Sequence, residues 1–388
     1  MAYWFSVYRA NLRQAWALMA QYRFAELIWA VWGFVGPLIS LAVWAAATAA
    51  RGGSIESARG AFDRADFAAY FLVFMIFGHL TMSWDAFEFA WRVRDGRLSP
   101  ALLKPIHPIH ADAATNIGFK LFTSTLLLPV WVLLFVLLKP SPPQSLFQLA
   151  LAVPAVLLAA VLRYIIMYAL ANVAFWTTRV EAVNQLFFTL DAFLSGRIAP
   201  LALLPGWFGT VAVFTPFRAM GAFPVELALG RVPPDQIAAG FALQVVCLAF
   251  AVVLFRVVWA AGIRQYSAVQ TDIEYRADFY TRIVASLLGM VTTVGALALA
   301  FTYTSNLRGW SFPQVMVLLA VYYLMDGIIE MFIAPNMRTI MGQVRDGTLD
   351  FVLLKPVSAQ FLATFRTVNI WRMVNVLVGL GLCIYAIG

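Results

Sequence analysis

Charged residues are scarce in this chain: Lys, Arg, Asp and Glu together account for 12% of its 388 residues, whereas hydrophobic residues account for 62%. A soluble globular domain carries roughly 25% charged residues, so the composition excludes that class. Several apolar stretches reach or approach the roughly 20 residues that an α-helix needs to cross a bilayer core. The chain is therefore predicted to be an all-α polytopic membrane protein.

Cysteine and histidine are nearly absent, with 2 and 3 copies respectively. Cys247 and Cys383 lie in apolar runs and indicate neither a disulfide framework nor a zinc site. His107 and His110 are separated by Pro108, which disfavours a shared helical face, so they are interpreted as solvated loop side chains rather than metal ligands. The phosphate-binding pattern G-x-x-x-x-G-K-[ST] is also missing, which predicts no ATP site and no cofactor in this chain.

Residues 1–26 lack the continuous apolar core and the cleavage site of a secretory signal peptide. The apolar side chains that recur there at helical spacing are Trp4, Tyr8, Leu12, Ala15 and Met19, with arginines elsewhere on the helix. This pattern favours an amphipathic helix lying in the membrane interface. An ordinary cytosolic helix is the alternative.

Apolar segments farther along predict a series of membrane spans. Their approximate limits are Leu27–Ala50, Phe67–Trp84, Ile117–Leu138, Leu146–Trp176, Ala182–Leu204, Ile237–Ala260, Ile283–Tyr303, Val315–Ala334 and Val368–Ile387. Basic residues gather in alternate connections; they include Arg9, Arg13, Arg23, Arg92, Arg94, Arg97, Lys104, Arg179, Arg264 and Arg276. The positive-inside rule therefore places the N-terminus in the cytoplasm. The net charge of +8 is read as this bias and not as a nucleic-acid surface.

One polar phrase occurs twice, as "VRDGRLSPALLKP" at Val93–Pro105 and as "VRDGTLDFVLLKP" at Val344–Pro356. The match extends upstream, where "YRFAE" and "YRADF" each precede a first span. These features predict a parallel repeat. We expect a six-span unit over residues 1–264, a cytoplasmic joint over 265–282, and a partial three-span unit over 283–388. The second copy lacks a counterpart of residues 139–260, which suggests a truncated fusion, a fragment, or a chain completed by another subunit.

The repeated phrase has the chemistry of a short helix between two bends. Each Asp-Gly pair is typical of a helix C-terminus, because glycine tolerates the left-handed conformation of a cap. The leucines that follow give a short helix an apolar side, and Pro105 and Pro356 end it. Such a helix can lie passively on lipid headgroups or dock in a groove on a partner. Two copies at equivalent cytoplasmic positions, in loops over about 85–116 and 335–366, favour docking.

The pattern G-x-L-x-x-x-L-L-K-P after a second span resembles the cytoplasmic loop of type-2 ABC transporter permeases. The similar group is the six-span branch known as ABC-2 family transporter proteins. "SGRIAPLALLPGW" at Ser195–Trp207, "FPVELALGR" at Phe223–Arg231 and "RQYSAV" at Arg264–Val269 also resemble that group. The resemblance implies short half-helices on the outer face over about 200–231.

The resemblance also implies that each repeated loop is a coupling element that contacts an ATPase. The first element would comprise Arg94, Asp95, Gly96, Leu98, Leu102, Leu103, Lys104 and Pro105. The second would comprise Arg345, Asp346, Gly347, Leu349, Leu353, Leu354, Lys355 and Pro356. The implied protein is a plasma-membrane exporter permease that is not itself an enzyme. Its expected partners are a separate ATP-binding ABC ATPase in two copies, membrane lipid, and in one arrangement a second permease chain, but no nucleic acid.

Ionisable residues in or beside the spans are candidate functional groups. They are Asp85 and Glu88 near the end of the second span, Arg163 in the fourth, Asp191 and Arg197 within the fifth, and Asp326 and Glu330 in the eighth. One interpretation places them along a substrate path or in a conformational ion-pair lock; the other is interhelical pairing that fixes packing. Two other functions stay open: an ion-driven carrier using Asp326 and Glu330, and a membrane-embedded enzyme acting on lipid-linked substrates through Asp85 and Glu88.

Overall fold

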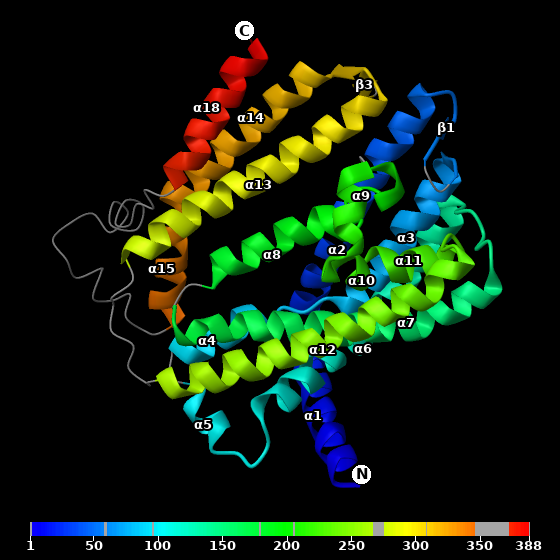
Figure 1. The fold of residues 1–388 in the computed structure, drawn as a ribbon. Helices are drawn as coiled ribbons and strands as arrows, with labels where there is room; N and C mark the ends of the chain where they lie inside the picture. The colour runs from blue at the N-terminus through cyan, green and yellow to red at the C-terminus, as the bar shows by residue number, and fades with distance from the viewer. Residues whose placement is uncertain are drawn as a thin grey trace, which may run out of the picture. The chain divides into compact units, whose positions relative to one another are not determined.

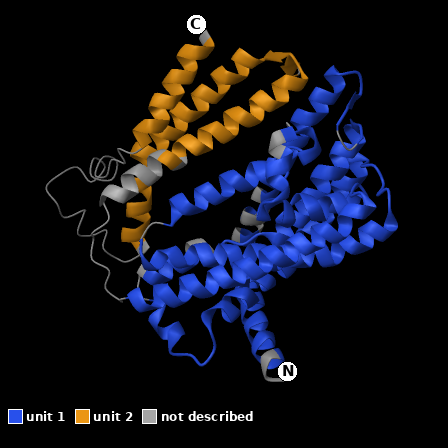
Figure 2. Cartoon of the chain, viewed as in Figure 1, with its two compact units in different colours: residues 1–274 blue, residues 275–388 orange. Residues whose placement is uncertain are grey.

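The computed structural model describes residues 2–57, 60–94, 97–177, 180–204, 206–266, 275–307, 309–345 and 372–387. The chain forms two compact units, residues 1–274 and 275–388 (Figure 2). Both units are helical, and their strands form two short antiparallel pairs. Each unit is described below by itself.

Unit 1 contains most of the helices (Figure 1). Its elements are α1 (Ala2–Gln21), α2 (Arg23–Ala50), β1 (Ser54–Ile55), β2 (Phe62–Asp63), α3 (Arg64–Thr81), α4 (Asp85–Arg94), α5 (Ser99–Leu102), α6 (Pro108–Leu138), α7 (Leu146–Ala171), η1 (Asn172–Phe175), α8 (Glu181–Leu194), η2 (Leu201–Leu203), α9 (Gly206–Val213), α10 (Pro216–Met220), α11 (Ala222–Leu229) and α12 (Pro234–Gln265).

Unit 2 repeats the beginning of that order on a smaller scale. Its elements are α13 (Tyr275–Tyr303), β3 (Asn306–Leu307), β4 (Trp310–Ser311), α14 (Phe312–Ile328), the π-helix η3 (Ile329–Ile333), α15 (Ala334–Arg345) and α18 (Met373–Ile387). α14 and α18 pack side by side, and α13 contacts α18 (Figure 1). Met316, Leu319 and Tyr323 form the buried core of the unit.

Long apolar helices confirm the predicted polytopic membrane class. Among the described residues, six helical segments are long and apolar enough to cross a membrane: Gly33–Ala50, Pro108–Leu138, Leu146–Phe175, Pro234–Gln265, Ser286–Tyr303 and Phe312–Val344. α3, α8 and α18, which correspond to the expected second, fifth and ninth spans, lie outside this set. α3 packs against α2, α6, α7 and α11, and most of its side chains are buried. The longer helices of unit 1 therefore surround α3.

The expected fifth span, Ala182–Leu204, is wrong in its second half. α8 ends at Leu194, and the chain turns at Gly196, whose φ of +82° lies in the left-handed region that favours glycine. The buried Tyr70 hydroxyl donates a hydrogen bond of 2.8 Å to the Gly196 carbonyl and fixes this turn. Arg197 consequently lies beyond the helix and not within a span. The following η2, α9, α10 and α11 are the short helices expected over about 200–231.

The N-terminal helix α1 turns an apolar face toward α6. Ala15 and Met19 are each 4% exposed and pack with Phe119 and Phe122. Two of the positions predicted to face the membrane interface therefore face protein. The Tyr8 hydroxyl lies 2.9 Å from His110 Nδ1 at the start of α6, which ties the two helices together.

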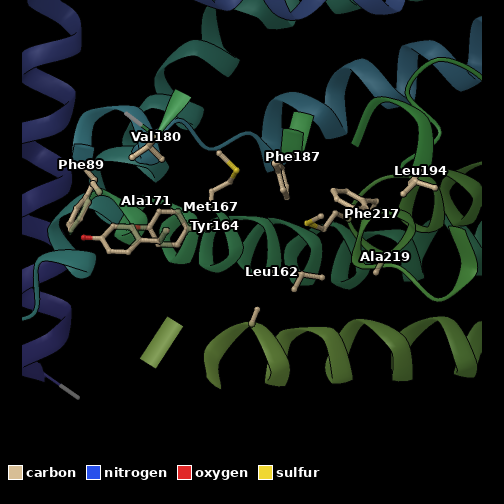
Figure 3. Close-up of a cluster of buried hydrophobic side chains, with 14 of the residues drawn as sticks. Phe89, Leu162, Tyr164, Met167, Ala171, Val180, Phe187, Leu194, Phe217 and Ala219 are labelled. Carbon is tan, nitrogen blue, oxygen red and sulfur yellow. The ribbon is translucent and has the colours of Figure 1, made fainter. Parts of the chain in front are cut away.

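The main hydrophobic core follows α7. Figure 3 shows Phe89 and Val180 toward one end of the cluster and Leu194 and Phe217 toward the other. α12 packs along α7 and η1, and Gly262 allows the approach to η1, because a Cβ there would lie 2.1 Å from the ring of Phe175. α7 is thus the helix that connects both ends of unit 1.

Candidate functional site

Residues 97–105 of the first repeated phrase include the single helical turn α5, which is fixed on one side and exposed on the other. Leu98 is completely buried, and Leu102 is half-buried against the same core. Leu103 is 87% exposed, and Lys104 and Pro105 beside it are exposed. The leucines predicted to share one apolar side therefore have separate roles: Leu98 and Leu102 anchor the turn, and Leu103 leaves an apolar side chain outside.

Side-chain contacts hold this turn and the helix before it. Ser99 Oγ lies 3.0 Å from the hydroxyl of Tyr266, just beyond the end of α12. Arg92 on α4 donates two hydrogen bonds to Asp112 on α6, at 3.0 and 2.6 Å. The Tyr168 hydroxyl on α7 donates to the same carboxylate at 2.8 Å. The Arg92–Asp112–Tyr168 network links three helices, and the sequence analysis missed it because these residues are far apart in the chain.

Several expected coupling residues lie outside what the structure describes. Asp95, Gly96, Asp346, Gly347, Leu349, Leu353, Leu354, Lys355 and Pro356 are not described, and the side chains of Asp85, Arg94 and Arg345 are also not described. α4 ends at Arg94 and α15 at Arg345, directly before the two Asp-Gly pairs. The second coupling element therefore stays a prediction.

His107 lies between the turn and α6, where it caps the helix. Its Nδ1 accepts a hydrogen bond of 3.1 Å from the Ile109 backbone N–H, and its ring lies 4.2 Å from that of Trp259. Burial lowers the pKa of His107, and the neighbouring His110 lowers it further. In the part of the chain that the structure describes, no group of three or more His, Cys, Asp or Glu side chains could hold a metal ion.

Three ionisable side chains predicted to lie in the fourth and fifth spans meet inside unit 1. Arg163 donates two hydrogen bonds to Asp191, at 3.1 and 2.9 Å, and the two side chains are 11% and 2% exposed. Arg197 reaches the same carboxylate only at 3.9 Å and keeps 45% of its side chain exposed. The three groups link α7, α8 and the turn after α8.

These three residues line a cavity of about 330 Å³ in unit 1. Its other walls come from α2, α3, α7, α8, α10 and α11; they include Gly33, Pro37, Phe74, Met75, Phe77, Gly78, His79, Met167, Phe188, Met220 and Val225. Pro37 has no N–H to bond the carbonyl of Gly33 one turn earlier. The cavity therefore combines mostly apolar walls with a few polar groups, as ligand sites do.

Two further ion pairs support the short helices beside the cavity. Arg218 on α10 contacts Glu226 on α11 at 3.4 Å, and both side chains are buried. Arg231 contacts Asp66 at the start of α3 at 2.7 Å. Glu226 and Arg231 belong to the "FPVELALGR" motif, but no local pattern in the sequence indicates their partners.

Asp326 and Glu330 in unit 2 face the same helix, as their spacing predicted. Arg372, just before α18, lies 3.8 Å from Asp326 and 3.6 Å from Glu330. Asn375 donates to Asp326 at 2.9 Å, and Arg338 contacts Glu330 at 3.1 Å. Glu330 lies in the π-helix η3, which the sequence did not predict; such segments often mark functional sites.

Glu88 is exposed on α4 and interacts electrostatically with Arg92 and Asp112. The structure does not join it with Arg163 or Asp191 in one site.

A family model described as "ABC-2 family transporter protein" matches residues 61–269 and 287–388. These segments include the α4–α5 turn, the cavity walls from α3 to α11, and most of unit 2. No curated protein and no solved structure matches the chain significantly.

Proposed function

Because this chain belongs to the ABC-2 family of transporter proteins, we propose that it is the permease subunit of an exporter driven by a separate ABC ATPase. The observation that carries the proposal is the α5 turn. It exposes Leu103 while Leu98 beside it is buried in the core. A docking element needs both an apolar contact for the partner and a rigid connection to the helices that move.

The connection runs through α4 and α7. Arg92 on α4 and Tyr168 on α7 both bond Asp112, so a displacement of the α4–α5 segment pulls on α7 as well. Arg163, one turn and a half away on α7, lines the cavity. ATPase closure beneath the turn would in this way change the shape of the cavity by rigid-body movement of packed helices.

The remaining features of the proposal follow the distribution of charge and the repeat. The chain lies in the plasma membrane with its N-terminus in the cytoplasm. It moves its substrate outward, as an exporter does. A second ATPase copy docks on the loop around Leu354, the counterpart of Leu103. ATP is bound and hydrolysed only by the partner.

The contacts in unit 2 do not favour the ion-driven carrier. Asp326 and Glu330 each lie within 4 Å of Arg372, so each carboxylate already has a counter-charge from this chain.

Co-purification with the ATPase subunit tests the proposal. The double variant Leu103→Glu/Leu354→Glu places a charge on both docking positions and should abolish association. Because Leu103 is 87% exposed, its replacement should leave thermal stability unchanged. Leu103→Met/Leu354→Met keeps the apolar volume and should retain the ATPase. Undiminished association and ATP-dependent export in the Glu variant would refute docking at these loops.

A further inference from the structure

The side chains that line the cavity in unit 1 carry more positive than negative charge. The titratable groups that line it are Arg163, Arg197, Asp191 and His79. Both oxygens of Asp191 accept hydrogen bonds from Arg163, so this pair is neutral overall. His79 Nε2 lies 3.0 Å from the Thr123 hydroxyl and is buried, which favours its neutral form. Arg197 therefore contributes a positive charge that no second carboxylate in the lining balances.

An arginine in such a place favours an anion. A cationic side chain in a mostly apolar cavity is unfavourable unless it is paired or hydrated. Arg197 approaches Asp191 only to 3.9 Å, beyond hydrogen-bond distance, and 45% of its side chain is exposed. Its planar fork of donors matches phosphate, sulfate or carboxylate oxygens. The group is thus available to an incoming ligand, while Arg163 is held by Asp191.

The rest of the lining is suited to an apolar chain. Phe74, Phe188, Met167 and Met220 contribute aromatic and thioether surface, and methionine adapts to irregular shapes. The volume of about 330 Å³ is near the lower end of the roughly 300–1,000 Å³ of ligand pockets. Met82, also in the lining, is exposed, so the cavity reaches the protein surface. A headgroup and the first part of a chain fit inside, and a longer chain continues toward lipid.

We propose that this cavity binds an anionic amphiphile, with its acidic headgroup on Arg197 and its chain against the Phe and Met walls. The inference rests on the proposed permease function, because it names the substrate class that such a permease would carry. The shared chemistry is one acidic headgroup joined to an alkyl chain. An anionic lipid of the bilayer and a soluble amphiphile both satisfy it.

Ligand binding to the full chain in phosphatidylcholine nanodiscs tests the charge requirement. Dodecyl phosphate should bind saturably above the background of protein-free discs. Arg197→Gln should weaken this binding by about tenfold to hundredfold, the effect of one hydrogen bond to a charged group. Arg197→Lys keeps the positive charge and should weaken dodecyl phosphate binding less. Arg51→Gln, which removes an exposed arginine at the end of α2, should change nothing.

A second pair of variants tests the location without touching a charge. Gly33 and Gly36 both lie on α2, both are exposed, and a Cβ at either meets no atom within 4 Å. Gly33 lines the cavity, whereas Gly36 does not. Gly33→Leu should therefore weaken dodecyl phosphate binding, and Gly36→Leu should leave it intact. Equal effects of the two variants would overturn the assignment to this cavity.

Other probes separate the possible ligands. Inorganic phosphate should bind much more weakly than dodecyl phosphate, and dodecyltrimethylammonium should not compete with it. If inorganic phosphate binds equally well, the site recognises a free anion and the amphiphile is refuted. If the cationic probe competes equally, the charge argument is refuted. If bilayer lipid occupies the site, replacing part of the phosphatidylcholine by phosphatidylglycerol should lower the apparent affinity of the wild-type chain for dodecyl phosphate. An unchanged affinity would indicate a soluble amphiphile.

ATPase co-purification, measured on the same samples, distinguishes this inference from the proposed function. Loss of dodecyl phosphate binding in Arg197→Gln with the ATPase still attached supports both. Saturable binding to a wild-type chain that attaches no ATPase refutes the proposed function alone. A wild-type chain that attaches the ATPase but binds no dodecyl phosphate refutes the inference alone.

Discussion

The Arg163–Asp191 pair gives a prediction in which the order of the effects comes from the structure. Asp191 is 2% exposed and holds Arg163 through two hydrogen bonds. In Asp191→Asn, Arg163 and Arg197 lose their shared counter-charge. Breaking a buried pair by removing one partner is expected to reduce the free energy of unfolding by about 3–5 kcal/mol.

Removal of Arg163, the other partner, should reduce the free energy of unfolding less than removal of Asp191. In Arg163→Gln, the Asp191 carboxylate still has Arg197 at 3.9 Å, and this half-exposed side chain can move closer. We expect a loss of about 1–3 kcal/mol, the range for a hydrogen bond to a charged group. The double variant Arg163→Met/Asp191→Leu removes both buried charges and should lose much less than the sum of the single variants.

Thermal unfolding of the purified protein in detergent measures these differences. At roughly 2–4 °C per kcal/mol for a chain of this order of size, Asp191→Asn should lower Tm by on the order of 10 °C. Arg338→Gln is the control: the Arg338 side chain is 68% exposed, so its ion pair with Glu330 should contribute at most about 1 kcal/mol. A larger loss in Arg163→Gln than in Asp191→Asn would contradict the geometry.

The same double variant separates the two interpretations of the pair. If the pair only fixes packing, Arg163→Met/Asp191→Leu should keep both Tm and transport-coupled ATP hydrolysis. If it is a conformational lock, the variant should keep Tm but lose the dependence of hydrolysis on substrate.

Two further outcomes are expected. Gly240→Ala should reduce the free energy of unfolding by about 1–3 kcal/mol, because its Cβ would lie 2.0 Å from the buried ring of Phe223. Gly36→Ala, with open space around it, should be neutral or slightly stabilising. Equal losses in the two variants would contradict the close packing of Gly240 on Phe223. Burial lowers the pKa of His107, so protonation favours the unfolded chain once the pH falls below the unfolded-state value of about 6.5. Tm should therefore fall less steeply between about pH 7 and pH 5 in His107→Gln than in wild type, and parallel profiles would refute this.

The membrane class and most helix positions could be predicted because they depend on local composition. Long apolar runs predicted α2, α7 and α12 within several residues of their observed ends, whereas α6 begins at Pro108, well before the expected start at Ile117. The turn α5 followed from a proline stop and leucine spacing. What the sequence did not determine is which leucine faces inward, because Leu98 and Leu103 have the same hydrophobicity and only tertiary packing separates them.

The cavity was less predictable, because its residues come from six helices, α2, α3, α7, α8, α10 and α11. Spacing alone could suggest that Asp326 and Glu330 share a face, since they are one turn apart. Arg163 and Asp191 belong to different helices, and no local pattern pairs them. The early end of α8 depended on a hydrogen bond between Tyr70 and Gly196, 126 residues apart. Hydrophobicity continues past that point, and so the predicted span ran too far.

The two units begin with a similar order of elements. In each, a long helix leads through a two-residue strand pair into a helix with a capping box, at Asp63 in unit 1 and at Ser311 in unit 2. That second helix then packs on the next described span, as α3 on α6 and α14 on α18.

The polar side chains at this contact differ between the two units. His79 and Glu330 are separated by the same number of residues as the two Asp-Gly pairs, and each faces the packed neighbour, His79 toward Thr123 and Glu330 toward Arg372. One position thus holds a buried neutral pair beside the cavity in unit 1 and an ion pair next to a π-helix in unit 2. Conservation of the scaffold with exchange of its polar groups is the expected result when two copies of one unit take on unequal roles. We expect the substrate-facing chemistry in unit 1, so a transport defect should follow from Arg197→Gln and not from Arg338→Gln.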